Sequence, residues 1–208
     1  MKKIEAFDLE SWTPKTYVGM MVKKGEIATI EDLFSRNLPI TEPNISRALL
    51  PNLEEEVVYR SHVQKQTDAG ERTRVATVVA IGNKDGYIGL GAGKGSEYGI
   101  ALIKARSEAL KSIFPVRRGC GSPECHCGMP HSVPFIVEGK QGSVRIKLIP
   151  APRGTGLIVP RYVIPILQLA GIADAWSFTT GETRTTRNLI YATLDALKKT
   201  RKIEVYYK

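Results

Sequence analysis

Three cysteines and two histidines fall within one short stretch of the chain, between Cys120 and His131. Thiolate and imidazole groups are the usual ligands of structural zinc sites, which hold the ion in a tetrahedron of four side chains. The spacing can close a site of three sulfurs and one imidazole. Its candidate ligands are Cys120, Cys125, Cys127 and His131, with His126 as the alternative fourth ligand. The other interpretation is a metal-free loop of reduced thiols, because three cysteines in a cytosolic chain argue against disulfides.

The same stretch raises the alternative of a zinc hydrolase or deaminase that acts on RNA, with Glu124 as its general base. Zinc deaminases, however, carry a His-x-Glu segment followed far downstream by Pro-Cys-x-x-Cys, and this chain lacks that order. A site filled by four protein ligands also leaves no position for a catalytic water. Metal analysis combined with a turnover assay would separate an enzyme from a structural site.

A second stretch suited to chemistry lies between Gly82 and Gly99, where seven glycines surround Lys94. We expect a strand, a tight turn, a glycine-spaced strand and a Gly-Lys turn that leads into a helix. Such a unit presents backbone N–H groups and a mobile cation to phosphate. Neither nucleotide signature fits, because the Rossmann pattern lacks its downstream acid and the Walker pattern is out of register at Gly93–Ser96. Phosphate contact with a polynucleotide is therefore favoured over nucleotide binding.

The 208-residue chain is basic, with 30 Lys and Arg residues against 21 Asp and Glu residues, a net charge of +9 and a pI near 9.5. This excess points to a polyanionic partner, nucleic acid first and anionic membrane second. No apolar run approaches the ~20 residues of a membrane span, and no signal-peptide block is present, so we expect a cytosolic protein. Because 10 of the 21 acids precede residue 57, the positive charge is concentrated in the later part of the chain.

The glycine-rich stretch belongs to a predicted strand–strand–strand–helix unit. The three strands are expected at Val57–Gln66, Thr73–Ile81 and Tyr87–Ala92, with turns at 67–72 and 83–86 between them. Residues 97–113 predict a helix with a buried stripe rich in alanine, which permits close packing on a sheet. The expected three-stranded antiparallel sheet with one helix across it has the element order of double-stranded-RNA-binding modules.

A second unit is predicted after the cysteine loop. Strands at 133–138 and 143–149 are expected to pair around Gly139–Gly142. The rigid basic turn Pro150–Gly156 should lead to a helix that ends at Gly171, with Pro165 in its first turns. A strand at 173–178 and a helix at 188–199 complete the unit.

An extension precedes both units. Short helices are expected around residues 29–34 and 44–50, and Thr29 with Asp32 resembles a capping box. We expect this segment to wrap the domain behind it rather than to fold independently. The predicted domains are thus residues 1–56 as extension, 57–118 as the first domain, 119–132 as the Cys/His loop and 133–208 as the second domain.

Several blocks of the sequence resemble one known family. They are QKQTDAGERTR (Gln64–Arg74), GYIGLGAGKGSE (Gly86–Glu97), and LIPAPRGTG (Leu148–Gly156) together with LAGI (Leu169–Ile172). Their combination in this order is similar to the small-subunit ribosomal protein number five family in its archaeal form, whose eukaryotic counterpart is numbered two. The segments Trp12–Pro14 and Leu38–Ile40 resemble the archaeal extension of that family.

This resemblance implies an α+β fold, in which a double-stranded-RNA-binding-like domain is followed by an α/β domain with a left-handed β-α-β crossover. It implies a structural, non-enzymatic role: binding small-subunit rRNA near the decoding region and the mRNA entry, in support of subunit assembly and translational accuracy. The implied neighbours are ribosomal proteins number four and number eight, with mRNA nearby and no membrane. No cofactor is required by the resemblance, and a structural zinc ion in the cysteine loop stays an open alternative.

Basic and polar residues in or beside the predicted turns are the expected rRNA contacts, because projecting loops reach phosphates that a flat sheet cannot. They are Arg60, Lys65, Gln66, Thr67, Arg72, Arg74, Lys84, Lys94, Arg117, Arg118, Arg153, Arg184 and Arg187. A phosphoryl-transfer enzyme is a further hypothesis, because the implied second-domain fold is shared with some small-molecule kinases and Pro152–Gly156 is glycine-rich. No carboxylate placed to hold Mg²⁺ accompanies that turn, and titration with ATP would test the hypothesis.

Overall fold

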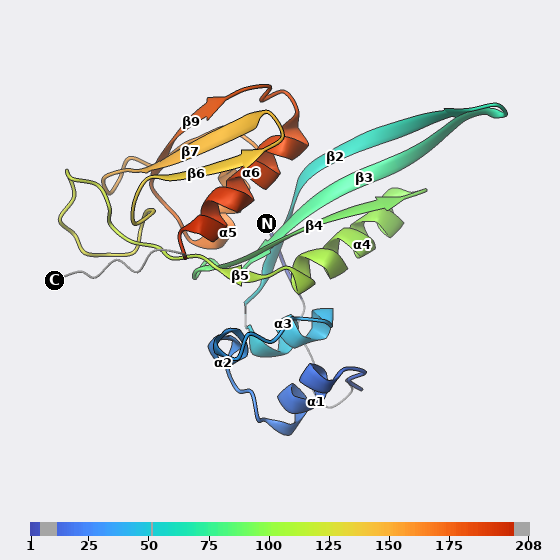
Figure 1. Cartoon of the computed structure of the whole chain (residues 1–208), viewed down its shortest axis with the longest axis horizontal. Coiled ribbons are helices and arrows are strands. Elements are labelled where there is room, and N and C mark those ends of the chain that lie inside the picture. Colours follow the sequence, from blue (N-terminus) through green and yellow to red (C-terminus); the bar gives the residue numbers. More distant parts are fainter. Residues whose placement is uncertain (5–11, 51, 202–208) are drawn as a thin grey trace. The chain divides into compact units, whose positions relative to one another are not determined.

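The computed structural model of the chain describes residues 1–4, 12–50 and 52–201 and divides into two compact units (Figure 1). Unit 1 contains the described residues up to Asn83 together with Gly89–Ile113, and unit 2 contains Lys84–Ile88 and the chain from Phe114 onward. Each unit combines helices with its own β-sheet. The predicted α+β class with two sheets is therefore confirmed.

Unit 1 is built around a long hairpin, β2 (Glu54–Thr67) and β3 (Gly70–Gly82), followed by β4 (Tyr87–Gly95) and helix α4 (Tyr98–Lys111). A short strand β1 (Lys2–Lys3) pairs with β2, so these strands form the first four of a five-stranded sheet in the order β1-β2-β3-β4-β5, in which β5 is Phe114–Pro115. The strand–strand–strand–helix order agrees with the prediction. The first turn, however, is shorter than predicted, because strand pairing continues out to Thr67 opposite Gly70 and leaves two residues to turn the chain.

Strand β4 and helix α4 approach each other at backbone distance. A Cβ atom built on Gly89 would lie 2.2 Å from the carbonyl oxygen of Ala109, and one on Gly91 would lie 2.1 Å from that of Ala105. Gly93 faces the carbonyl of Ala101 in the same way. These glycines stand in a continuous strand that runs through Gly95, so the predicted Gly-Lys turn before the helix is wrong. Their physical role is to admit a helix to the sheet, and they do not form a phosphate-binding loop.

Three short helices precede the hairpin: α1 (Tyr17–Lys24), α2 (Ile30–Ser35) and α3 (Pro43–Leu49). The Thr29–Asp32 capping box at the start of α2 is confirmed, with both of its reciprocal hydrogen bonds present. Helix α1 was not predicted. The three helices share an apolar cluster, and the buried Ser46 hydroxyl of α3 donates a hydrogen bond of 2.7 Å to the Leu110 carbonyl of α4.

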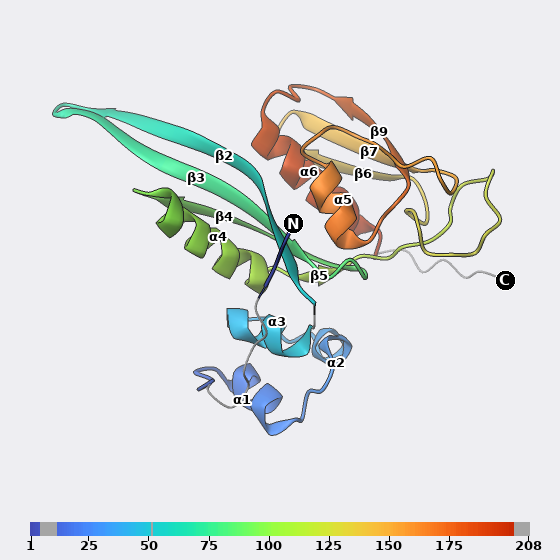
Figure 2. The same ribbon diagram turned by 180° about the vertical axis from the view of Figure 1, so that it is seen from behind.

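Unit 2 contains a sheet in the order β6-β7-β9-β8, built from β6 (Val137–Gln141), β7 (Val144–Pro150), β8 (Leu157–Ile158) and β9 (Ala175–Thr180). Helices α5 (Ile164–Ala170) and α6 (Thr186–Lys199) lie on one face of this sheet, in front of the strands when seen from behind (Figure 2). Strand β8 runs parallel to β9 and α5 connects them, which makes a β-α-β unit whose handedness stays a prediction. Helix α5 ends at Gly171 with φ +80°, as predicted.

The first strand of unit 2 begins later than predicted. Residues 137–141 form β6, and the hairpin turns at Gly142, where φ is +60°. The strand also runs through Gly139, which the sequence places in the turn. A Cβ on Gly139 would lie 1.9 Å from the Ala192 carbonyl of α6, so this glycine packs against a helix inside the strand. It is not part of the turn.

The segment Lys84–Ile88 is an integral part of unit 2. The N–H groups of Lys84 and Gly86 donate hydrogen bonds to the carbonyls of Leu169 and Ala170 at the end of α5, at 2.9 and 3.2 Å. Its last two residues, which begin β4, pair with the short strand β5 (Phe114–Pro115). Within the described part of the chain, no helix is both long and apolar enough to cross a bilayer.

The close contact of β4 with α4 predicts the cost of adding one methyl group. Gly91→Ala should destabilise the protein by roughly 1–3 kcal/mol, because its Cβ meets helix backbone that cannot move aside. Urea unfolding would measure the change. Gly99→Ala is the matched control, since Gly99 is an exposed residue of α4 with no heavy atom within 4 Å of its Cβ, and it should leave the stability unchanged or raise it slightly. Equal effects of the two variants would contradict this account of the glycines.

Candidate metal centre and nucleic-acid interface

The cysteine-rich loop of unit 2 is closed at its base and joined to the strand β9 region. Gly119 and Ser132 pair as an antiparallel bridge, with backbone hydrogen bonds of 2.8 and 2.9 Å. The carbonyl of His131 accepts hydrogen bonds from the N–H groups of Ala173 and Asp174, which directly precede β9. These backbone contacts hold the last residues of the loop, so that the side chain of His131 has a defined direction.

The folded loop gathers four potential ligand atoms, from Cys120, Cys125, Cys127 and His131, all within 4.8 Å of one another. The sulfurs of Cys120 and Cys127 are 3.5 Å apart, and the Cys125 sulfur is 3.7 Å from Nε2 of His131. Atoms bonded to one tetrahedral zinc ion at 2.0–2.3 Å lie roughly 3.3–3.8 Å from each other. The two separations therefore suit a single zinc ion, and between the two histidines left open by the sequence it is His131 that joins the cluster.

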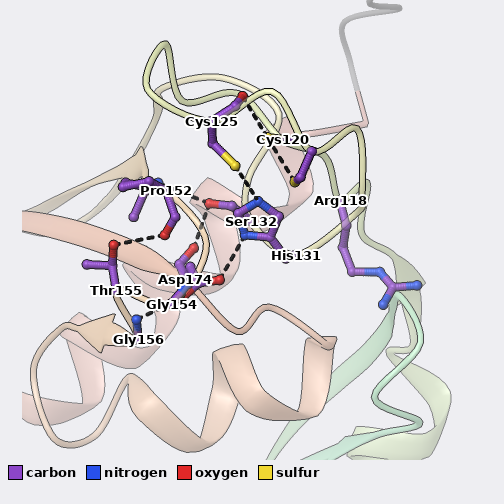
Figure 3. Close-up of polar contacts among 12 residues, drawn as sticks. Arg118, Cys120, Cys125, His131, Ser132, Pro152, Gly154, Thr155, Gly156 and Asp174 are labelled. Carbon is purple, nitrogen blue, oxygen red and sulfur yellow. Dashed lines mark hydrogen bonds and ion pairs between the residues drawn. The ribbon is translucent and has the colours of Figure 1, made fainter.

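Asp174 contacts the ring nitrogen of His131 that does not face the Cys125 sulfur (Figure 3). Its Oδ2 atom is 2.8 Å from Nδ1 of His131, and the two side chains are only 6% and 10% exposed. A carboxylate next to Nδ1 holds a proton on that nitrogen and leaves the Nε2 lone pair directed toward the sulfurs. Metal-binding histidines commonly have such a carboxylate partner. The sequence gives no signal for Asp174, because nothing in its neighbourhood relates it to a loop some forty residues away.

The thiols of the cluster differ in acidity in the metal-free protein. Burial raises the pKa of the Cys120 thiol to about 11, and hydrogen bonds with Cys125 and Cys127 add to the rise. The backbone N–H of Arg153, followed by that of Cys127, lowers the pKa of the Cys125 thiol to about 6. Zinc binds thiolates, so Cys125 is already in the form that the metal requires at neutral pH. Donor set, spacing and the buried carboxylate all fit a structural zinc ion.

The basic residues of the β2–β3 hairpin form a separate candidate site in unit 1. Lys65 and Arg72 are directly opposite each other in the strand pairing, and Arg74 is opposite Val63, two positions further along β3. Because side chains alternate between the two faces of a hairpin, these three cations share one face. All three are exposed, and none of them forms an ion pair with any residue that the structure describes.

The remaining hairpin candidates lie differently. Arg60 alternates onto the opposite face from Lys65, where its guanidinium stacks 4.5 Å from the ring centre of Tyr98 in α4. Gln66 is exposed beside the tip, whereas the Thr67 hydroxyl donates to the Gly70 carbonyl at 2.6 Å and helps to close the turn. Figure 1 shows β2 and β3 continuing well beyond the end of β4, so that the tip projects from the sheet. The hairpin thus carries its cations on an extended arm.

Most of the other predicted rRNA contacts are exposed, but the Arg118 side chain is largely buried and is bound to other groups of the protein. Its guanidinium pairs with Asp85 and lies 3.5 Å from the Gly171 carbonyl, and its side chain is 19% exposed. It therefore ties the Lys84–Ile88 segment to the end of α5 within unit 2. Arg187 stacks on Tyr191 at 5.7 Å in α6. The remaining exposed candidates are Lys84, Lys94, Arg117, Arg153 and Arg184.

Comparison with known proteins identifies two matching family models. Residues 53–117 match the N-terminal domain of ribosomal protein S5, and residues 139–208 match its C-terminal domain. The chain is 52% identical over 201 residues to the small ribosomal subunit protein uS5 of Saccharolobus solfataricus, covering 97% of this chain and 94% of that one. It is 55% identical over 193 residues to the protein of the same name from Aeropyrum pernix, covering 93% and 88% of the two chains.

The unequal thiol acidities predict an order of modification once metal is removed. In EDTA at pH 7.5, iodoacetamide should alkylate Cys125 roughly tenfold faster than Cys120, since the larger thiolate fraction outweighs the lower nucleophilicity of a weakly basic thiolate. Tandem mass spectrometry of the partly modified protein would assign the sites. Modification of Cys120 first would contradict the arrangement of hydrogen bonds in the loop, and guanidinium-unfolded protein, in which the two should react alike, is the control.

Proposed function

The chain belongs to the ribosomal protein S5 family, whose members are structural rather than enzymatic constituents of the small ribosomal subunit, and we propose that it binds small-subunit rRNA through its hairpin arm. The observation that carries this proposal is the cationic face of β2 and β3. Like charges directly opposite each other destabilise a hairpin. A phosphate backbone lying along that face would neutralise Lys65 and Arg72 together, and the release of its counterions would favour binding.

The strand–strand–strand–helix order of unit 1 supports a double-stranded-RNA-binding-like mode of contact. Such modules recognise the shape and backbone of an RNA helix rather than its base edges. The chemistry of the hairpin face suits this mode, because its lysine and arginine side chains reach phosphate oxygens and the aliphatic Val63 between them has no hydrogen-bonding group. We infer contact with folded rRNA by shape and charge, supplemented by the exposed cations Lys94, Arg153, Arg184 and Arg187.

Family membership supports a finer placement as a proposal. We propose that the chain lies near the decoding region and the mRNA entry of the small subunit, beside ribosomal proteins number four and number eight, where it supports assembly and translational accuracy. We also infer that the crossover from β8 through α5 to β9 is left-handed. The name shared by the relatives from Saccharolobus solfataricus and Aeropyrum pernix supports the subunit assignment, and the exposed cationic face of the hairpin supports the proposed role within it.

We further propose that Cys120, Cys125, Cys127 and His131 bind one structural zinc ion. The supporting observations are the four ligand atoms within 4.8 Å and the buried Asp174 that orients His131. Four protein ligands complete the tetrahedron, so the ion would act as a crosslink and not as a catalyst. A hydrolase or deaminase is disfavoured for the same reason, and the ion would stabilise a loop that contributes few large apolar side chains of its own.

Reversing the charge of the hairpin face tests the rRNA proposal. Arg72→Glu with Arg74→Glu should reduce incorporation into reconstituted small subunits at least about tenfold and should lower the salt dependence of binding by roughly two phosphate contacts. Sucrose-gradient sedimentation at several KCl concentrations would measure both effects.

The matched control is Lys15→Glu with Lys24→Glu, which makes the same charge change at exposed positions of the same unit, before and at the end of α1. It should be incorporated almost as the wild type is. Equal loss in the two variants would show that only the total charge matters, and full incorporation of the hairpin variant would refute the proposed contact.

The zinc proposal predicts about one zinc ion per chain in protein purified without chelator, measured by inductively coupled plasma mass spectrometry. His131→Asn should remove this zinc, whereas His126→Asn should retain it, because only His131 lies in the four-ligand cluster. Chelation should also lower the thermal midpoint of the wild type, because binding of the ion stabilises the folded state. A wild-type protein that is fully folded and contains no zinc would exclude the site.

A further inference from the structure

The carboxylate of Asp174 faces two different parts of unit 2 (Figure 3). Its Oδ2 atom contacts Nδ1 of His131, while its Oδ1 atom accepts hydrogen bonds from the N–H groups of Gly154 and Gly156, at 3.1 and 2.8 Å. The two glycines belong to the basic turn Pro150–Gly156 and have φ values of +90° and +75°. One buried side chain thus bonds both to the proposed metal ligand and to the backbone of a loop distant from it in sequence.

The turn also meets the cysteine loop at two other points. The backbone N–H of Arg153 faces the Cys125 sulfur, where it lowers the pKa of that thiol. The Ser132 hydroxyl accepts a hydrogen bond from the Ala151 N–H at 3.2 Å and donates one to the Asp174 carbonyl at 2.6 Å. Each of these attachments is made by a proposed zinc ligand or by the residue next to one, so the backbone of the turn follows the geometry of the metal centre.

The hydrogen bonds of Asp174 indicate which nitrogen of His131 carries the proton. Backbone N–H groups can only donate, so Oδ1 must act as an acceptor, and a carboxylate accepts at both oxygens. Oδ2 is therefore placed to accept from Nδ1–H of His131, and in the neutral ring that tautomer keeps the lone pair on Nε2. If the side chain were an amide with its oxygen toward the glycines, its NH₂ group would face Nδ1 and favour the tautomer with the proton on Nε2, so that metal binding at Nε2 would have to displace that proton and would be weaker.

We propose that Asp174 couples metal binding to an RNA-binding turn: it selects the histidine tautomer that binds zinc, and with its other oxygen it fixes the backbone that presents Arg153 to an rRNA phosphate. The inference rests on the proposed zinc site and the proposed rRNA role. Arg153 is exposed at the middle of the turn, and the N–H of the next residue, Gly154, donates to Asp174. A turn that is ordered before binding loses less conformational entropy when it contacts RNA.

The role of Asp174 as a positioning residue is tested with Asp174→Asn in the full-length protein. Zinc affinity, measured by competition with a chelating dye, should fall about 10–100-fold. Long-range ¹H–¹⁵N spectra of the zinc-free protein should show His131 protonated at Nδ1 in the wild type and at Nε2 in the variant. Asp195→Asn is the control, because Asp195 is a carboxylate of α6 that binds Lys140 and Lys199 outside the loop, and it should change neither measurement.

A tautomer that is the same in the wild type and in Asp174→Asn would overturn the proposal, as would an undiminished zinc affinity. Weakening that persists in a His131→Cys background, where no tautomer exists, would show that Asp174 acts by general support of the fold and would also overturn it.

The coupling between the metal centre and the backbone of the turn is tested in the wild type alone, so this test does not depend on whether a variant folds. Removing zinc should raise hydrogen exchange at the Gly154 and Gly156 amides about tenfold or more, while amides of the β2–β3 hairpin stay unchanged. Unchanged exchange in the turn with zinc bound and removed would overturn the coupling and leave the zinc site intact. A wild-type protein that contains no zinc would overturn both the coupling and the zinc site. Incorporation into small subunits tests the rRNA role separately.

Discussion

The structure depends on helices that lie directly on strand backbone. In unit 1 the glycines of β4 meet the backbone of α4 at alanine positions, and in unit 2 Gly139 of β6 meets the backbone of α6 at Ala192 and Ala196. Because glycine and alanine fill this interface, neither element can gain a methyl group there without separating the helix from the sheet. At these glycine positions the helix backbone lies directly on the strand backbone in each unit, with no side chain between them. The candidate rRNA contacts that are exposed lie instead on hairpins, turns and outer faces of the elements.

The same constraint explains which parts of the fold were predictable. Alternation, turn residues and the alanine stripe predicted the strand–strand–strand–helix order and the end of α5 at Gly171, because these signals are local. Glycine in a strand that faces a helix cannot be told from glycine in a loop without its spatial neighbours. For this reason the glycines of β4 were interpreted as a phosphate-facing turn and Gly139 was assigned to a hairpin turn. Helix α1 was missed because Val18, Gly19 and Val22 are weak helix formers that are buried in a cluster shared with other segments.

The candidate sites show a similar division. Spacing alone selected the three cysteines, but it left the choice of histidine open, since both histidines are within reach along the chain. The structure brings in His131 because its backbone is held by the residues that precede β9, and it adds Asp174 from the same place. Among the basic residues, composition suggested one class of exposed cations. Strand register then separates Lys65, Arg72 and Arg74 from Arg60, and the contact with Asp85 removes Arg118 from that class.

A metal crosslink suits the physical situation of the cysteine loop and the turn beside it. Neither segment has regular hydrogen bonding of its own, and Gly154 and Gly156 have backbone conformations that other residues rarely adopt. Ordering such backbone costs about 1–2 kcal/mol per residue in conformational entropy, which apolar burial normally offsets. Here the outer residues of the loop are exposed and bury little apolar surface, so the offset must come from directional bonds at a few points. Asp174, Ser132 and the four side chains of the Cys/His cluster provide such points, and the hydrogen bonds of Asp174 and Ser132 reach both the loop and the basic turn.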